Sequence, residues 1–396
     1  MPLPLNPAMM ATDVSPVPEA ARWLAGVDFP PNRPLINVSQ AAPVAAPPTA
    51  LRAAMARALL EETASHLYGP DLGLPALREA LAEQVSEQYG GEVSPAQVAI
   101  TSGCNQAFAA AIATLAGPGD EVLLPTPWYF NHKMWLDMSS IRAVPLPTDN
   151  ALRPRLDAAE ALITPRTRAI ALVSPNNPAG VEYPSELIAA FRDLARTHGL
   201  ALVIDETYRD FHSGNGAPHD LLSDPDWDDT VIRLYSFSKA YRLTGHRIGA
   251  MMSSPARLAE VEKFIDSVTI CPSQVGQRGA LWGIRNLGDW LAGERREILG
   301  RRHAIEDGFP RLAAKGWKLK GCGAYFAYVE HPFALSSDQL AREMVEAVGV
   351  LCLPGTMFEP RGDASGPRHL RIAYANIDRN GIAALFDRLE CLDLPR

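Results

Sequence analysis

The sequence predicts an α/β fold: a three-layer sandwich in which helices cover both faces of a mostly parallel sheet, with a smaller α+β domain beside it. Between residues 98 and 235, short apolar runs alternate with helical segments, which is typical of parallel strands buried on both faces. After about residue 280, long charged helical segments and alternating strands follow. We therefore expect an N-terminal arm that also joins the small domain (1–50), a large domain (51–280) and a small C-terminal domain (281–396).

The first 50 residues are rich in proline and alanine, and their closely spaced prolines disfavour a long helix. We expect an extended arm laid over the body of the protein and anchored by Phe29, Leu35 and Ile36. A disordered tail is the alternative, and it fits residues 1–15 better than residues 27–45.

In the large domain, five short apolar runs predict strands: 98–101, 121–124, 169–173, 200–204 and 231–235. Helices are expected over 75–89, where a proline stands near the first turn, over an alanine-rich stretch that ends near residue 115, and over 184–198. In the small domain, helical patterns cover 282–311, 340–348 and 380–389, and strand patterns cover 323–329 and 369–374.

Composition excludes several classes of protein. The 396 residues are 47% hydrophobic and 21% charged, as in ordinary globular proteins. A net charge of −8 without a basic block argues against nucleic-acid binding, and no apolar run is long enough to span a membrane. The five cysteines are scattered and form no C-x-x-C pair, which argues against a metal site and favours a reducing cytoplasm. The N-terminus lacks the features of a signal peptide.

The stretch 236–249, Ser-Phe-Ser-Lys-Ala-Tyr-Arg-Leu-Thr-Gly-His-Arg-Ile-Gly, follows an apolar strand and places Lys239 among hydroxyls and the cations Arg242 and Arg247. Burial disfavours the charged form of a lysine, and a desolvated amine beside other cations can form a Schiff base. Ser236, Ser238 and Arg247 suit a phosphate. A reactive amine beside a phosphate site indicates pyridoxal phosphate that is bound through Lys239. The alternative interpretation is that Lys239 is an ordinary surface lysine.

Other candidates also follow the carboxyl ends of expected strands, where open α/β sheets bind ligands. The turn Gly103-Cys104-Asn105 opens a helix, and exposed N–H groups there favour a phosphate. Asp205 ends a strand, where it pairs with a protonated pyridine nitrogen or, alternatively, caps a helix or pairs with a cation. Tyr208 and Asn177 are placed to reach the phenolic oxygen of the ring.

Two further residues fit the same chemistry. Tyr129 offers a flat face for stacking on the cofactor ring, with Trp128 as the alternative and simple core packing as the non-functional interpretation. Arg371 stands in an otherwise apolar strand and needs an anion. Its planar guanidinium can bind a substrate carboxylate through two hydrogen bonds, or it can form a structural salt bridge.

With these motifs placed, residues 35–390 closely resemble the class I/II aminotransferases, pyridoxal-phosphate enzymes of fold type I. The resemblance is carried by Ser236-Phe-Ser-Lys239, Thr244-Gly-His-Arg-Ile-Gly249, Asn177-Pro-Ala-Gly180, Asp205-Glu-Thr-Tyr208, Tyr68-Gly69 and Pro354-Gly355. It implies an amino-acid donor, a 2-oxo-acid acceptor and a homodimer with shared sites, in which Tyr68 reaches the cofactor phosphate of the neighbouring subunit.

The resemblance also implies residue roles. Lys239 is the Schiff-base lysine and proton shuttle, Asp205 holds the ring nitrogen, and Arg371 holds the substrate carboxylate. Two departures affect the substrate pocket. Ala41 and Ala42 stand where the family usually has a glycine in an L-x-x-G-x-P pattern whose backbone approaches the substrate carboxylate, and His246 stands where a bulkier residue is common.

Three alternatives remain at this level. The same cofactor supports β-elimination, decarboxylation or racemisation. Ser236-x-x-Lys239 formally matches the S-x-x-K of serine acyl enzymes, although S-D-N and K-T-G are absent. An effector-binding module of a transcription regulator would need a larger, more basic N-terminal segment. For the donor, the sequence shows no obvious second arginine for a dicarboxylic side chain, with a residue of the partner subunit as the alternative source. Trp128 and Phe130 favour a neutral or aromatic substrate.

Overall fold

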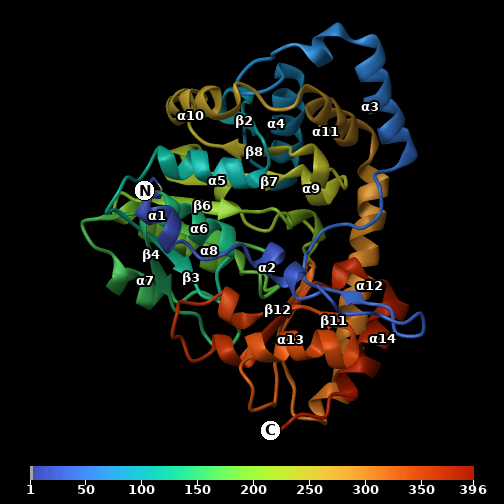
Figure 1. Ribbon diagram of the computed structural model, residues 1–396. Coiled ribbons are helices and arrows are strands. Elements are labelled where there is room, and N and C mark those ends of the chain that lie inside the picture. The colour runs from blue at the N-terminus through green and yellow to red at the C-terminus, as the bar shows by residue number, and fades with distance from the viewer. Residues whose placement is uncertain (1–2) are drawn as a thin grey trace.

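The computed structural model describes residues 3–396, and its centre is a seven-stranded sheet in the order β2-β8-β7-β6-β5-β3-β4 (Figure 1). β8 runs antiparallel to both of its neighbours, whereas all other neighbouring pairs are parallel. The predicted, mostly parallel sheet is therefore confirmed. The strands are β2 (Val98–Thr101), β3 (Glu121–Pro125), β4 (Arg142–Leu146), β5 (Thr167–Val173), β6 (Ala201–Asp205), β7 (Val231–Ser236) and β8 (Gly249–Met252).

Helices pack on both faces of this sheet. Alternate side chains of a strand point to opposite faces, so Ile170 and Leu172 of β5 join one apolar cluster while Ala169 and Ala171 join the other. The first cluster includes side chains of α4 (Pro75–Tyr89), α7 (Leu156–Leu162), α8 (Ser185–Thr197) and α11 (Gln274–Asn286). The second includes side chains of α5 (Cys104–Ala113), α6 (Phe130–Met138) and α10 (Pro255–Thr269). The three-layer architecture follows.

A second, antiparallel sheet in the order β12-β13-β10-β9 lies with its own apolar cluster at the other end of the molecule (Figure 1). Its strands are β9 (Lys318–Gly323), β10 (Phe326–Glu330), β12 (Leu353–Pro354) and β13 (His369–Ile372), and its helices are α13 (Ser337–Val348) and α14 (Arg379–Glu390). β1 (Ile36–Asn37) pairs in parallel with β11 (Val350–Leu351), which joins part of the arm to this α+β unit. The domain limits near residues 50 and 280 stay predictions.

Two expectations about elements need correction, and two strands, β4 and β8, were not predicted. The strand expected over 323–329 is a hairpin, because the chain turns between β9 and β10 with Ala324 at a φ of 45°. The helix expected over 282–311 is divided at Leu287, where α11 ends and α12 (Gly288–Ala313) begins. The sequence does not predict β4, because Pro145 interrupts its strand pattern. Proline is tolerated at this place since β4 lies at the edge of the sheet. β8 is short and its Gly-Ala-Met-Met sequence has little β-propensity.

The N-terminal arm contains short helices rather than only extended chain: α1 (Pro7–Ala11) and α2 (Pro16–Arg22) precede α3 (Thr49–Glu61). In place of a disordered tail, α1 packs against α6; residues 1–2 lie outside the described part. Arg342 of α13 lies 3.3 Å from Glu19 and 4.6 Å from the ring centre of Trp23. The arm therefore crosses the junction between the large and small units (Figure 1).

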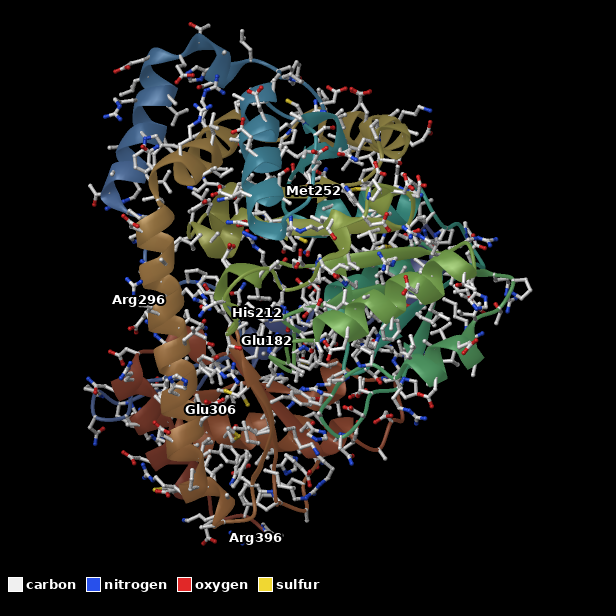
Figure 2. The ribbon with its side chains drawn as sticks, turned by 180° about the vertical axis from the view of Figure 1, so that it is seen from behind. Glu182, His212, Met252, Arg296, Glu306 and Arg396 are labelled. Carbon is white, nitrogen blue, oxygen red and sulfur yellow. The ribbon has the colours of Figure 1, made fainter. Side chains whose placement is uncertain are left out.

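The long helix α12 links the two units along one side of the molecule. Arg295 donates to the carbonyl of His212 at 2.9 Å, and His212 lies 3.4 Å from Glu182. Glu182 and His212 lie beside α12 at the lower end of the large unit (Figure 2). These contacts position α12 against the loops that follow β5 and β6. No helix within residues 3–396 has the length and apolar character that a bilayer crossing requires; the cytoplasmic location stays a prediction.

A buried ionic cluster lies directly behind the ends of β6 and β7. Glu206 accepts hydrogen bonds from Arg233 and, at 2.7 Å, from the Tyr89 hydroxyl, and His219 lies 3.4 Å away. Burial by itself raises the pKa of Glu206, but Arg233 and His219 lower it overall. The cluster holds the loop after β6 against β7, so it supports the two strands that carry Asp205 and Lys239.

Arg233→Ala should lower the free energy of unfolding by about 3–5 kcal/mol, because removal of one partner leaves the Glu206 charge buried and uncompensated. Guanidinium unfolding followed by fluorescence measures the effect. Arg311→Ala is the control: Arg311 is exposed and pairs with Glu390 at 2.6 Å and Asp387 at 2.7 Å. Because solvent screens exposed ion pairs, its loss should lower the free energy of unfolding much less. Equal free energies of unfolding for the two variants would show that the buried cluster stabilises the fold no more than an exposed ion pair does.

Candidate active site

A cavity of about 430 Å³ opens at the carboxyl ends of the parallel strands, between the large sheet, the small unit and the N-terminal arm. Its walls include most of the residues that the sequence singled out: Ala41, Ala42, Cys104, Asn105, Tyr129, Asn177, Asp205, Tyr208, Ser236, Ser238, Lys239, Arg247 and Arg371. Gly103 lies immediately behind the wall, and Tyr68 lies elsewhere on the surface. The fold therefore brings Ala41 and Arg371, which are 330 residues apart in sequence, into one site.

Lys239 lies on the short helix α9 (Phe237–Ala240), directly after β7. Its Nζ donates to the carbonyl of Ala41 at 2.5 Å and lies 5.8 Å from the ring centre of Tyr208. Burial, together with the charges of Arg247 and Arg371, lowers the pKa of Lys239 to about 8. A substantial fraction of this amine is therefore unprotonated near neutral pH, which a nucleophile or a base requires.

The turn between β2 and α5 forms a cradle for an anion. Gly103 precedes α5 with a φ of 87°, a conformation that favours glycine. A Cβ at Gly103 would lie 2.2 Å from Nη2 of Arg247, so glycine also makes room for that guanidinium. Arg247 donates to the carbonyl of Thr244 at 2.9 Å. Helix N–H groups, serine hydroxyls and a guanidinium face the same space, a donor set that fits a phosphate group.

Asp205 ends β6 and is 2% exposed. It accepts the N–H of Thr207 at 2.9 Å, and Nε2 of His132 lies 3.2 Å from its carboxylate. Burial by itself raises the pKa of Asp205, but His132 and Thr207 lower it overall. The carboxylate therefore stays ionised in a buried place, which suits pairing with a protonated ring nitrogen.

The sequence analysis missed His132, which stacks on Phe108 with ring centres 3.7 Å apart. His132 lies on α6, three residues after Tyr129, and residues at this spacing share a helix face. The ring centres of Tyr129 and His132 are 5.0 Å apart. The sequence did contain a signal for His132: it stands three residues after Tyr129, shortly beyond an expected strand.

Arg371 of β13 is 2% exposed and lies between the rings of Phe326 and Phe358, at 5.1 and 4.9 Å from their centres. It donates to Oδ1 of Asn177 at 3.0 Å and to the carbonyl of Ser39. Burial lowers the pKa of Arg371 to about 10. Its Nε has no hydrogen-bond partner, and no carboxylate within residues 3–396 forms an ion pair with it. This guanidinium is placed to receive an anion from outside the chain.

The structure distinguishes Tyr129 from Trp128, the two candidates for stacking on the cofactor ring, by where each side chain lies. Tyr129 lines the cavity and its hydroxyl donates to Oδ1 of Asn105 at 3.3 Å. Trp128 is buried outside the cavity wall, with Lys133 5.5 Å from its ring centre. Tyr208 is buried against Tyr325, with ring centres 5.3 Å apart. Tyr129 is therefore the side chain available for stacking.

Besides Gly103 and Trp128, three candidate site residues named from the sequence do not line the cavity of this chain: Tyr68, Arg242 and His246. Tyr68 is 80% exposed, and its neighbour Gly69 donates to the sulfur of Cys271 at 3.4 Å. His246 is exposed on the 3₁₀ turn before Arg247 and does not line the cavity. Arg242, expected beside the lysine, pairs instead with Glu294 at 2.6 Å.

The sequence analysis also missed part of the wall. Ser15, Val17 and Pro18 from the arm, Gln40, and Asn131 from α6 all line the cavity, as do Val173, Thr207 and Thr244. Phe130, which the sequence analysis named for the substrate pocket, lines it as well. No local signal marks the arm residues, because only the path of the arm across the junction brings them to the site.

A buried amine, an anion cradle and a buried guanidinium around one cavity form an arrangement that suits an anionic cofactor and a carboxylate substrate. The comparison with known proteins agrees: residues 33–389 match the family model of aminotransferase class I and II. The chain belongs to this family, whose members depend on pyridoxal phosphate. The predicted family, fold and enzyme class are confirmed.

The chain is 30% identical to an arginine–pyruvate transaminase of Pseudomonas aeruginosa, over 77% of each chain. It is 28% identical to an aromatic aminotransferase of Arabidopsis thaliana, over 81% of this chain and 80% of that protein. Among solved structures, it is similar to the aspartate aminotransferase of Thermus thermophilus with maleate, with a TM-score of 0.86 and 26% identity over 98% of this chain and 99% of the other.

In cofactor-free protein, acetylation of Lys239 by trace acetic anhydride should accelerate as the pH rises through about 8 and then level off. The reason is that only the unprotonated amine reacts and burial has lowered its pKa. In the urea-unfolded chain, the same lysine should continue to accelerate toward its ordinary pKa of about 10.4. Peptide mass spectrometry measures both profiles, and coincident profiles would contradict the lowered pKa.

Proposed function

We propose that this aminotransferase holds pyridoxal phosphate covalently at Lys239 and moves an amino group between an L-amino acid and a 2-oxo acid. The observation that carries the proposal is the position of the Lys239 amine, buried in one cavity with Arg247 and Arg371. Arg247 lies at the anion cradle, and Arg371 lines the same cavity with a buried Nε that has no hydrogen-bond partner within residues 3–396. The reactive nitrogen thus lies between a phosphate site and a carboxylate site.

The residues present fit the cofactor. When bound, pyridoxal phosphate supplies an electron sink that stabilises negative charge at the α-carbon of the donor. Asp205 would hold the ring nitrogen, Asn177 and Tyr208 the phenolic oxygen, and Tyr129 the ring face. The phosphate would be held by Gly103, Cys104, Asn105, Ser236, Ser238 and Arg247.

The substrate is positioned by Arg371, whose planar guanidinium binds the α-carboxylate through two parallel hydrogen bonds. The carbonyl of Ser39 and Oδ1 of Asn177 already occupy the other donors and fix the plane of the guanidinium. Ala41 and Ala42 lie beside this place, in keeping with a role in substrate binding. An anchored carboxylate fixes the direction of the Cα–H bond, which is the bond that must break.

Lys239 Nζ is the group that takes and returns the α-proton. Its pKa of about 8 is close to neutral pH, so the nitrogen both accepts and releases a proton without a large penalty. The carbonyl of Ala41 accepts a hydrogen bond from Nζ and holds it on the cavity side of α9. β-Elimination or decarboxylation would use the same residues; membership of the aminotransferase family favours transamination.

Lys239→Ala should abolish both covalent attachment and nearly all turnover, since no other amine lines the cavity within residues 3–396. Borohydride reduction with added pyridoxal phosphate, followed by peptide mass spectrometry, measures attachment. Coupled assay of donor and 2-oxo acid measures turnover and shows whether one acceptor is consumed for each donor. Lys263→Ala is the matched control, because Lys263 is exposed on α10 and pairs with Glu260. Retention of both properties in Lys239→Ala would refute the proposal.

We also propose a homodimer with shared sites. Exposed apolar side chains gather near Tyr68, where the loop after α3 meets the end of α10: Leu60, Leu67, Tyr68, Val268 and Ile270. The bond from Gly69 to Cys271 joins these two segments. A contiguous exposed apolar patch is typical of an interaction surface. A second copy covering it would bury Tyr68 and bring its hydroxyl toward the phosphate cradle of the partner.

If the sites are shared, mixing Tyr68→Ala and Lys239→Ala subunits should restore activity above the sum of the two parents. In a mixed dimer, one site combines an intact Lys239 with an intact Tyr68, because a two-fold dimer exchanges the same surface in both directions. Unfolding and refolding the mixture, followed by the coupled assay, gives the measurement. A mixture no more active than its parents would place Tyr68 outside the site.

A further inference from the structure

The charges and apolar groups of the cavity wall indicate which kind of side chain the donor amino acid has. The inference drawn from them rests on the proposed function. The wall contains three cationic side chains, Lys239, Arg247 and Arg371, and one carboxylate, Asp205. Each cation already has an assigned anion or reaction: the reactive amine, the phosphate and the α-carboxylate. Within residues 3–396, therefore, the wall offers no fourth cation for a second carboxylate on the substrate.

Cations close to the wall are also committed. Lys133, on the same helix as the wall residues Phe130 and Asn131, donates to Asp137 at 2.6 Å. Arg361, at the outer side of the arm, pairs with Asp13. Bringing either group to the cavity would break an existing ion pair. The charges that one subunit places around the site thus oppose a dicarboxylic donor, because a buried carboxylate without a partner is costly. A cation supplied by the second subunit of the proposed dimer would reverse this preference, and the comparison of leucine with aspartate below tests for it.

Apolar side chains also lie near Arg371, although its hydrogen-bond partner in the wall is Asn177. The Arg371 guanidinium lies on the ring of Phe358, and the rings of Phe358 and Phe130 are 5.7 Å apart. Val17 and Phe130 both line the cavity and both pack on the apolar cluster that contains Phe358 and Leu353. A donor whose carboxylate is on Arg371 and whose α-carbon faces Lys239 directs its side chain to the remaining wall, where these groups lie.

We infer that the preferred donor is an L-amino acid with an uncharged, apolar side chain of aliphatic or aromatic type, and that Phe130 and Val17 form the surface that receives it. Ser15, Gln40 and Asn131 add only neutral polar groups to the wall. The preference has two causes. Apolar contact with Phe130 and Val17 favours leucine or phenylalanine, and the lack of a free cation in the wall formed by residues 3–396 disfavours aspartate and glutamate.

Leucine and aspartate make a matched pair, because their side chains have nearly the same branched shape and differ in charge. With the holoenzyme and a 2-oxo acid acceptor, kcat/KM for leucine should exceed that for aspartate by about tenfold or more. Binding is measured separately with α-methylleucine and α-methylaspartate, which carry no α-hydrogen and cannot complete the reaction. Absorbance titration should show the same order of affinities.

Phe130→Ala should weaken binding of α-methylphenylalanine by about tenfold or more and leave binding of α-methylaspartate nearly unchanged. Phe264→Ala is the matched control, since Phe264 packs edge-on against Trp135 and does not line the cavity; it should change neither. A preference for aspartate, or equal losses for both ligands in Phe130→Ala, would overturn this inference and leave the aminotransferase proposal intact. Failure of every donor to react would instead overturn the proposed function.

Discussion

The site depends on the burial of positive charge. Three cations and one carboxylate line the cavity of a chain whose net charge is −8. Two of these cations, Lys239 and Arg371, have pKa values lowered by burial, so each is held at a cost in free energy relative to water. Anions that enter the cavity would compensate these charges. The proposed binding of a phosphate and a carboxylate therefore agrees with the electrostatics of this site.

The large sheet supplies the rigidity that this charge distribution needs. Asp205 and Lys239 follow β6 and β7, which are neighbouring parallel strands. Behind them, Glu206, Arg233 and Tyr89 form a hydrogen-bonded cluster that ties the two strand ends together. Catalytic groups on strand ends that are cross-linked in this way keep their separation when ligands bind. The small unit contributes Arg371, so the carboxylate site is set by how the two units pack, with α12 as the connection.

The N-terminal arm gives the chain-specific part of the site. Its β1 strand belongs to the small unit, its Ser39 carbonyl binds Arg371, and the carbonyl of Ala41 binds Lys239. The same arm supplies Val17 to the outer wall. One segment thus touches the reactive amine, the carboxylate receptor and the side-chain pocket. Changes in the arm are therefore expected to affect which donor is accepted more than how the proton is moved.

The sequence by itself determined the layered fold, because that follows from hydrophobic periodicity. Local spacing along the chain also predicted Lys239 and the polar residues at the strand ends as site residues, and the structure brings them into one cavity. The sequence did not determine the hairpin at Ala324, the edge strand that contains Pro145, or the pairing of His132 with Asp205, since each depends on neighbours distant in sequence. Only the tertiary structure showed that Arg371 lacks an ion-pair partner within residues 3–396, and that Val17 and Phe130 share a wall. Charge compensation and pocket shape are properties of the packed chain, and a linear pattern does not carry them.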